Sequence, residues 1–303
     1  MFLQFGTPLK MFTVKKTAQS AAIFVCLFMP VMKSAPAFAN DRLMDAIQAT
    51  ETQLDGRVGV SILNAENGRE WQYRADERFP LTSTFKLFAC AAVLHKVDQG
   101  TEILDRRVEY RSSDLMTYSP VTKQHLDTGM TIRELCEAAL YFSDNTAANL
   151  ILEALGGPDA LTAYLREIGD NVTRLDRIEP DLNEAKPGDA RDTTTPNAVR
   201  SSVTNLVLGY ALSAHSRQTL EGWLAGNKVG GPLLRAGLPH DWKIADRTGA
   251  GGFGSRAIVA VIRPPEQKPV IVAIYITQTS ASMDERNTAI AELGREIVTA
   301  VTR

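Results

Sequence analysis

The chain has 303 residues, 44% hydrophobic and 22% charged, which is the composition of a globular protein and not of a disordered or fibrous one. Its formal net charge of −2 at pH 7 gives no indication of a nucleic-acid or anionic-membrane partner. This length accommodates one large domain or two closely packed domains.

The first 39 residues have the pattern of a cleaved Sec signal peptide. They contain four lysines and no acidic residue, and their apolar run, residues 21–32, is too short to cross a hydrocarbon core of about 30 Å. Ala37 and Ala39 supply the small residues of a cleavage site, so the mature chain is predicted to start at Asn40 and to be periplasmic, without a membrane anchor. Met1 and Met11 both remain open as the initiator.

Hydrophobic periodicity predicts the elements that follow. Apolar residues at helical spacing indicate a helix over 41–54, and alternating apolar residues on both sides of a turn indicate a β-hairpin over 57–74. Helical patterns dominate from about residue 80 to residue 226. Within this region, a helix buried on all sides is expected over 85–97, and shorter helices are expected over 131–142 and 146–155.

Residues 173–197 differ from the rest of the helical region, because they carry prolines and charges with little periodicity. A loop of this length inside a compact region is usually functional or disordered. Segments rich in Ile and Val then predict strands over 243–248, 256–263 and 269–277, followed by a helix over 282–302.

Two strands near the start of the chain and three near its end predict the α+β fold class. We expect a five-stranded antiparallel sheet with flanking terminal helices, and an all-α domain inserted between its strands. The expected sheet domain is discontinuous, with residues 40–78 and 228–303, and the helical domain covers 79–227.

The first motif that bears on chemistry is Ser83-Thr84-Phe85-Lys86. Residues three apart share a helix face, and a lysine in a water-poor site has its pKa lowered enough to take a proton from a serine. Taken alone, the motif is weak, because a capping serine followed by a surface lysine gives the same pattern.

Two further motifs are equally weak in isolation. Ser143-Asp144-Asn145 lies between two predicted helices, where these residue types also serve as caps. Arg247-Thr248-Gly249 ends a strand and offers a cation and a hydroxyl to a carboxylate, although a hairpin turn with a surface arginine is the alternative. The turn 249–254 also matches G-x-G-x-x-G, but a strand follows it where a dinucleotide site requires a helix.

The fourth motif lies in the long loop, where Glu179 and Asn183 are four residues apart. A carboxylate and an amide at this spacing can share one water and direct it at an ester, whereas the alternative is an acidic solvated loop. The motifs S-x-x-K, S-D-N and K-T-G in this order form the signature of class A β-lactamases and penicillin-binding proteins.

The chain resembles class A serine β-lactamases over essentially its whole mature length. The residues that carry the resemblance are 81–86, 118–122, 143–145, the omega-loop segments within 174–196, and 254–256. The resemblance implies the serine β-lactamase/D,D-peptidase-like fold, with an omega loop over 174–192. The third motif begins with Arg247 instead of lysine, which resembles the carbenicillin-hydrolysing subgroup.

The resemblance also implies roles. Ser83 is the nucleophile, Lys86 or a water on Glu179 accepts its proton, Ser143 protonates the leaving nitrogen, and Glu179 activates the water that hydrolyses the ester. The residues implied to bind substrate or form the oxyanion hole are Asn145, Asn183, Arg247, Thr248, Gly249, Ala250, Arg256 and Tyr118. Arg177 and Asp192 are implied to pair across the neck of the omega loop.

Cys90 and Cys136 match the cysteine pair that forms a disulfide in many members, and two buried free thiols are the alternative. No cofactor or metal is implied, because the four histidines are scattered along the chain. We expect a monomer that acts on a small β-lactam substrate. The rival interpretations are a D,D-peptidase, against which Glu179 and Asn183 argue, a membrane-bound β-lactam sensor, and a noncatalytic secreted binding protein.

Overall fold

A computed structural model describes residues 11, 13 and 42–302. Apart from residues 11 and 13, the expected signal peptide lies outside the described residues, as do its cleavage site and Asn40. Within the described part, no helix is both long and apolar enough to cross a membrane. Residues 42–302 form one compact unit, so the division of the chain into a sheet domain and a helical domain stays a prediction.

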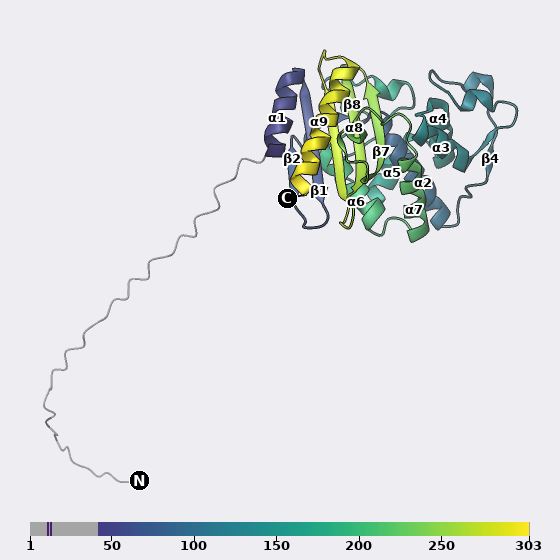
Figure 1. Ribbon diagram of the computed structural model, residues 1–303. Helices are drawn as coiled ribbons and strands as arrows, with labels where there is room; N and C mark the ends of the chain where they lie inside the picture. The colour runs from purple at the N-terminus through teal and green to yellow at the C-terminus, as the bar shows by residue number, and fades with distance from the viewer. Residues whose placement is uncertain (1–10, 12, 14–41, 303) are drawn as a thin grey trace, which may run out of the picture. The chain divides into compact units, whose positions relative to one another are not determined.

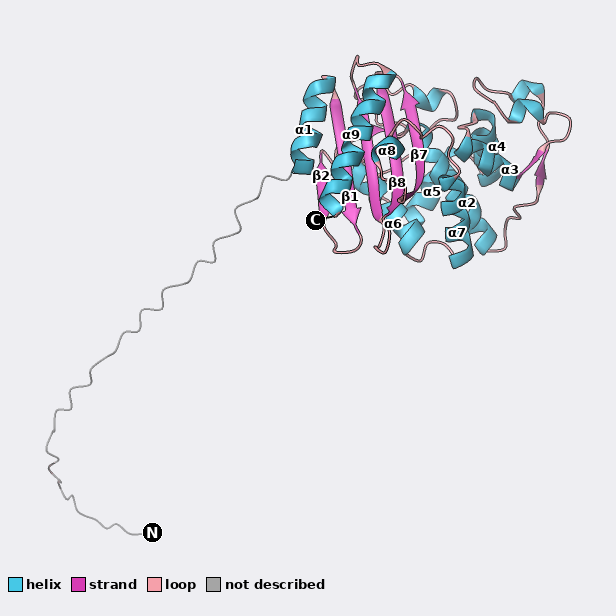
Figure 2. Cartoon of the chain, viewed as in Figure 1, coloured by secondary structure: helices cyan, strands magenta, loops and turns pink. Residues whose placement is uncertain are grey.

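The core of the fold is the predicted five-stranded antiparallel sheet, in the order β2-β1-β9-β8-β7 (Figures 1 and 2). Strand β9, although last in the sequence, is central and pairs with β1 and β8. The sheet therefore combines strands from both ends of the chain, as predicted. The bounds are β1 Arg57–Asn64, β2 Glu70–Tyr73, β7 Lys243–Gly251, β8 Ser255–Arg263 and β9 Val270–Thr277.

Strand β9 is buried on both faces, which explains why its sequence is a continuous apolar run. Residues Val270, Val272, Ile274 and Ile276 belong to one apolar cluster, whereas Ile271, Ala273 and Tyr275 belong to the other. The alternation follows from the two-residue period of a strand. The sheet thus separates two cores.

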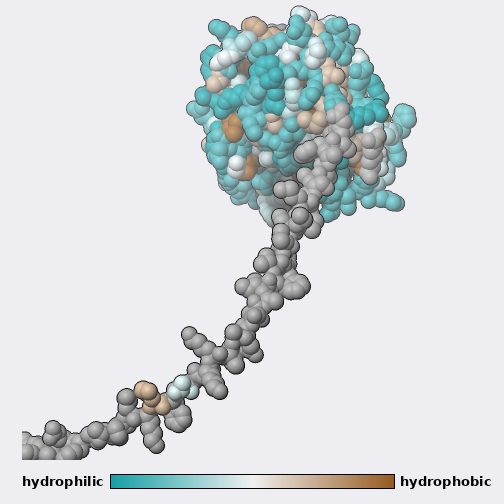
Figure 3. Space-filling model, turned by 90° about the vertical axis from the view of Figure 1, so that its left-hand side faces the viewer, coloured by the Kyte–Doolittle hydropathy of each residue, from teal (hydrophilic) through white to brown (hydrophobic). Residues whose placement is uncertain are grey.

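Three helices cover the first face of the sheet: α1 (Arg42–Leu54), α8 (Leu234–Gly237) and α9 (Met283–Val301) (Figure 1). Their buried residues include Ile47, Leu234 and Ile297. Figure 3 shows the α1 side of the molecule, where the surface is largely hydrophilic. The apolar stripe of each helix is accordingly turned toward the sheet.

The second core lies between the sheet and the remaining helices. Helix α2 (Phe85–Asp98) is buried at ten consecutive residues and packs against helices α3, α4, α5 and α7. A helix that is apolar all round is expected at such a central place. The other bounds are α3 Ile132–Tyr141, α4 Asn145–Leu155, α5 Pro158–Glu167, α6 Pro196–Leu208 and α7 Ala214–Ala225.

Several short elements complete the fold and were not predicted. Two-residue strands form the pairs β3 (Phe79–Pro80) with β6 (Thr193–Thr194) and β4 (Arg107–Val108) with β5 (Met130–Thr131). Four single 3-10 turns are η1 Thr82–Thr84, η2 Ser112–Asp114, η3 Thr122–Gln124 and η4 Asp181–Asn183. Turn η1 leads directly into α2, and η4 lies in the long loop between α5 and α6.

Candidate active site

The structure brings Ser83, Lys86 and Glu179 together. Ser83 lies in turn η1 and Lys86 in the first turn of α2, whereas Glu179 comes from the long loop. The Ser83 hydroxyl donates to Glu179 Oε1 at 3.3 Å, and Lys86 Nζ lies 2.9 Å from the same oxygen. The alternative of a surface lysine is wrong, because the Lys86 side chain is fully buried.

Burial lowers the pKa of Lys86 to about 8, a net shift that Glu179 opposes and the nearby Arg247 supports. Taking an ammonium out of water disfavours its charged form. A lysine with this pKa is partly neutral near pH 8 and can accept a proton from a hydroxyl.

Ser143 links this group to the turn between α3 and α4. Its hydroxyl donates to Ser83 Oγ at 3.3 Å and accepts from Lys86 Nζ at 3.3 Å and from Arg247 Nη2 at 2.5 Å. The backbone at Ser143 has a φ of 63°, a left-handed conformation that a serine adopts at some energetic cost. Two cationic donors stabilise negative charge on this oxygen, so its proton is easier to transfer.

Asp144 and Asn145 have separate tasks in the same motif. The Asp144 carboxylate caps α4 by accepting from Ala147 N, and it also accepts from the backbone N–H groups of Val121 and Thr122. The capping interpretation is therefore correct for Asp144, which in addition ties this turn to the segment that follows Tyr118. Asn145 Oδ1 accepts from Lys86 Nζ at 2.7 Å.

Glu179 is held from two directions. Asn149 in α4 accepts from Glu179 N and donates to Glu179 O, both at 2.9 Å, so it fixes the backbone. Asn183 Nδ2 donates to the Glu179 carboxylate. The other amide atom, Asn183 Oδ1, is buried and has no hydrogen-bond partner among the described residues. A buried acceptor of this kind is normally satisfied, which indicates a place for a water beside the carboxylate.

The neck of the long loop is closed by an ion pair. Arg177 Nε lies 2.6 Å from Asp192 Oδ2, and the other oxygen of Asp192 accepts from the backbone N–H groups of residues 176 and 177. Asp192 is buried. The pairing that the resemblance implied is therefore present in the structure.

Arg247 lies in β7 and is enclosed by the site. Its guanidinium donates to Ser83 O at 3.0 Å, to Leu140 O at 3.3 Å and to Ser143 Oγ. The alternative of a surface arginine is wrong, since the side chain has no exposed area. Burial lowers the pKa of Arg247 to about 10, which leaves it charged at neutral pH. Each of the three guanidinium nitrogens therefore donates to a protein oxygen.

Glycine at 249 allows β7 to approach η1 closely. A Cβ at this position would lie 2.0 Å from Thr82 Oγ1 and 3.1 Å from Ser83 N, closer than real contacts. Strand β7 therefore passes directly beside Ser83, and Ala250 is the next residue of the strand. Thr82 has a φ of 46°, and its buried hydroxyl is unpartnered in the part of the chain described.

The β7–β8 turn contacts the long loop. Gly252 N donates to Asn183 O at 2.9 Å, and a Cβ on Gly252 would lie 2.3 Å from Glu184 O. The register of Gly251 opposite Ser255 confirms a hairpin at this turn, as predicted, in place of a dinucleotide site.

Arg256 in β8 lies opposite Ala250 in β7. Its Nε donates to Asn287 Oδ1 at 2.8 Å and its Nη1 to Gly249 O at 3.2 Å, while Nη2 has no partner among the described residues. Burial, together with Arg286, lowers the pKa of Arg256 to about 10.

Thr248 is buried in β7, whereas Tyr118 is 56% exposed. The carbonyl of Tyr118 accepts from Asn145 N at 3.1 Å, which holds the aromatic residue next to the Ser143–Asn145 turn.

Sequence reasoning missed Asn149 and Asn287. Asn149 follows Asn145 by one helical turn, so the i, i+4 spacing on α4 was an available signal. Asn287 is 31 residues from Arg256 and carries no local signal.

Cys90 and Cys136 are free thiols in the structure, so the expected disulfide is not formed here. Both are buried, and Cys90 Sγ lies 4.0 Å from the carbonyl oxygen of Cys136. Burial and the neighbouring Cys90 raise the pKa of the Cys136 thiol. In the residues that the structure covers, no group of three or more potential ligands is arranged to hold a metal ion.

Known proteins match this chain over nearly all of its described length. A family model described as "Beta-lactamase enzyme family" matches residues 42–301. Beta-lactamase AER-1 of Aeromonas hydrophila is 50% identical over 283 residues, which are 92% of this chain and 93% of that relative. Beta-lactamase PSE-4 of Pseudomonas aeruginosa is 49% identical over 271 residues, or 89% and 94% of the two chains. The solved structure of an ancestral class A beta-lactamase superposes with a TM-score of 0.85 at 56% identity and covers 86% of this chain and 100% of that one.

Proposed function

The chain belongs to the beta-lactamase enzyme family as a class A β-lactamase related to the carbenicillin-hydrolysing enzymes, and we propose that Ser83, Lys86, Ser143 and Glu179 carry out its reaction. The enzyme hydrolyses the β-lactam ring of penicillins and thereby confers antibiotic resistance. The observation that carries the residue assignment is that the Ser83 hydroxyl and the Lys86 ammonium meet at one oxygen of Glu179, at 3.3 Å and 2.9 Å.

In the acylation step, Ser83 Oγ attacks the lactam carbonyl carbon and its proton passes to neutral Lys86 or to Glu179. The backbone N–H groups of Ser83 and Ala250 receive the oxyanion, and one such donor lowers the barrier by about 3 kcal/mol. When the carbon–nitrogen bond breaks, Ser143 protonates the ring nitrogen and recovers a proton from Lys86. The contacts from Ser143 Oγ to Ser83 Oγ and Lys86 Nζ support this route.

In the deacylation step, Glu179 takes a proton from a water that the unpartnered Asn183 Oδ1 helps to hold. The resulting hydroxide attacks the ester carbon, Ser83 leaves, and the proton returns to its oxygen. The bonds from Asn149 to the Glu179 backbone, and the Arg177–Asp192 pair, keep the carboxylate aligned with the ester.

The substrate carboxylate binds to Thr248 and Arg256, whose hydroxyl and Nη2 are free to donate. Buried Arg247 contributes its charge and orients Ser143 and the Ser83 carbonyl. Asn145 binds the side-chain amide of the substrate, Gly249 lets the ring approach the strand, and Tyr118 forms a wall of the cleft.

The protein acts in the periplasm as a monomer, after removal of residues 1–39. A basic, apolar segment with small residues at 37 and 39 supports export of the chain. Among residues 42–302, none of the helices could span a membrane.

Turnover of carbenicillin tests the proposal. Purified mature protein should open many equivalents of carbenicillin per enzyme, with no stoichiometric burst followed by arrest. A single burst would instead favour a D,D-peptidase or a sensor, which acylate and release slowly. The Ser83→Ala variant, which keeps the fold but lacks the nucleophile, is the control and should be inactive.

A further inference from the structure

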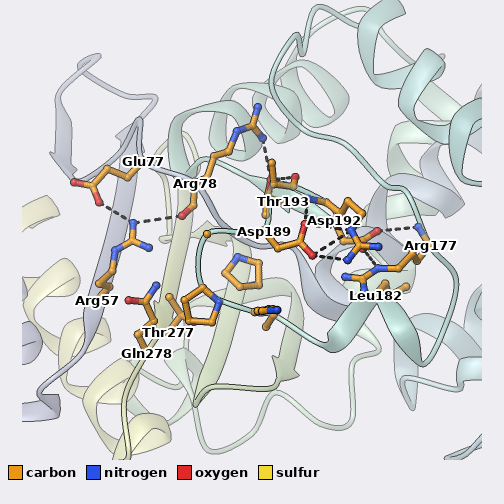
Figure 4. A pocket seen from close by; sticks show the side chains of 17 residues that line it. Arg57, Glu77, Arg78, Arg177, Leu182, Asp189, Asp192, Thr193, Thr277 and Gln278 are labelled. Carbon is orange, nitrogen blue, oxygen red and sulfur yellow. Dashed lines mark hydrogen bonds and ion pairs between the residues drawn. The ribbon is translucent and has the colours of Figure 1, made fainter.

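A cavity of about 340 Å³ lies between the sheet and the omega loop (Figure 4). Arg57 of β1 and Gln278 after β9 contribute to the sheet side, whereas residues 182–193 form the loop side. The four proposed catalytic residues are not among the residues that line it. The cavity is therefore distinct from the penicillin site, although one of its walls is the loop that carries Glu179.

The lining of the cavity has more positive than negative charge. Its carboxylates are already engaged: Asp192 by Arg177, Asp189 by Arg191, and Glu77 by Arg57 and Arg74. Glu184, beside the cavity, pairs with Arg177 and Arg191. Five cationic side chains face these four carboxylates, namely Arg57, Arg78, Arg177, Lys186 and Arg191. A net positive lining favours an anionic ligand.

Cations on both the sheet side and the loop side retain free donors, among them Arg57 on the sheet and Lys186 on the loop. Arg57 donates through Nη2 to Glu77 and to the Arg78 carbonyl, while its Nε and Nη1 have no partner among residues 42–302. The Arg57 guanidinium lies 4.7 Å from the centre of the Phe79 ring, which helps to fix its orientation. Lys186 is exposed on the loop, and no hydrogen bond or ion pair engages its ammonium in the described structure.

The cavity also has apolar lining residues. Pro80, Leu182, Ala185 and Pro187 line the cavity together with the charged residues. Figure 4 shows Arg57 and Gln278 on one side and Asp189 and Arg177 on the other. An inorganic anion would satisfy one cation but leave the apolar surface uncovered, whereas an organic spacer between two anionic groups would cover it.

We propose that this cavity binds a small organic dicarboxylate, with one carboxylate on Arg57 and the other on Lys186. The guanidinium and the ammonium are suited to carboxylates, and Arg57 is already oriented. Because Arg57 belongs to the sheet and Lys186 to the omega loop, the bound dianion ties the loop to the sheet. It does not compete with penicillin, because none of the four proposed catalytic residues lines the cavity.

Thermal unfolding of the mature protein tests the proposal. Adipate and isophthalate, at constant ionic strength, should raise the Tm by about 3 °C at ten times their dissociation constant, because they bind the native state. The monocarboxylates hexanoate and benzoate, and sulfate, should have little effect at the same concentrations. Amide hydrogen exchange of residues 182–192 should slow with adipate and not with hexanoate.

Variants of the lining residues test whether the dicarboxylate-dependent rise in Tm arises from binding in the cavity. Lys186→Ala and Arg57→Gln should each abolish the dicarboxylate-dependent shift, measured against the variant's own Tm without ligand. Lys268→Ala is the matched control, because Lys268 is an exposed lysine in the β8–β9 turn, and it should retain the shift. Equal shifts with sulfate or hexanoate, or a shift that survives in Lys186→Ala, would overturn the proposal. The test contains no penicillin, so its failure would leave the catalytic assignment untouched.

Discussion

Lys86 Nζ lies 2.9 Å from Glu179 Oε1, and both side chains are fully buried. Each charge compensates the other in a place where neither is solvated. Removing one partner of such a pair typically destabilises a protein by about 3–5 kcal/mol, because the other charge is left unpaired. Variants at these positions must therefore be compared for stability as well as for activity.

Replacing Glu179 should separate the two chemical steps. Glu179→Gln keeps a polar group beside Asn183 and Lys86 but removes the base, and general bases contribute about 10²–10⁴ to a rate. We expect the kcat for penicillin to fall within that range, while a covalent adduct accumulates on Ser83. Mass spectrometry of the intact protein checks this outcome, with Ser83→Ala as the adduct-free control. If excess penicillin gives no adduct, Glu179 is not the deacylating base.

The pH dependence of acylation should follow Lys86. Its pKa is lowered to about 8, so the neutral, proton-accepting form increases as the pH rises through 8 and acylation accelerates over that range. Glu179 holds this pKa up, so Glu179→Ala should move the rise to lower pH. Stopped-flow acylation of both proteins between pH 6 and 9 measures the shift. An unchanged profile in Glu179→Ala would exclude Lys86 as the base.

Lys86 also links stability to pH. The folded-state pKa lies below the unfolded value of 10.5, so the unfolded state binds more protons between the two. The stability contribution of this group is therefore lowest below pH 8 and increases as the pH rises from 8 toward 10.5. Urea unfolding at several pH values, compared with Lys86→Met, should show that increase in the parent protein alone.

Arg247 should act mainly by holding three oxygens in place. Arg247→Ala leaves the Ser83 carbonyl, the Leu140 carbonyl and Ser143 Oγ without their donor, and each unsatisfied buried acceptor costs about 1–3 kcal/mol. We expect a loss of both stability and acylation rate. Arg247→Lys keeps the charge and should retain more kcat/KM for carbenicillin than Arg247→Ala. Equal activity in the two variants would show that the positive charge near Ser143 is unimportant.

Opening the neck of the omega loop should impair deacylation more than acylation. Asp192→Asn removes the charge that pairs with Arg177 but keeps one acceptor oxygen for the backbone N–H groups, so the free energy of unfolding should fall by about 2 kcal/mol, as for the loss of one hydrogen bond to a charged group. The acyl-enzyme should persist longer than in the parent. Asp189→Asn is the control on the same loop, because its pair with Arg191 is exposed, and both properties should change little.

The two thiols should form a disulfide under oxidising conditions. Cys90 and Cys136 are in contact and buried, and closing a loop of this length adds up to about 4 kcal/mol through the unfolded state. The oxidised protein should be two hydrogens lighter by mass and should unfold at a higher urea concentration. Cys136→Ser should show neither change.

The sheet could be predicted because its strands are long and apolar. Strand β9, buried on both faces, gives an unbroken apolar segment, and the β1–β2 hairpin gives alternation around a turn. The pairs β3–β6 and β4–β5 could not be predicted, because a strand of two residues is too short to show a hydrophobic periodicity. Helices α5, α6 and α7 lie in the region that was predicted to be helical, but their individual bounds were not predicted.

The sequence predicted which residues make up the candidate site, but it did not predict the burial and contacts of all of them. Ser83, Lys86, Ser143 and Glu179 meet as expected, because each lies in a recognisable motif. The complete burial of Arg247 could not be predicted, because the same sequence, Arg-Thr-Gly, also occurs at exposed strand ends. The bonds of Asn149 to the Glu179 backbone likewise depend on how α4 docks against the loop.

The central place of β9 has a consequence for biosynthesis. Residues 270–277 separate β1 from β8, so a growing polypeptide cannot close its sheet until translation is nearly finished. The last strand of the sequence thus joins β1 to β8 and completes the sheet.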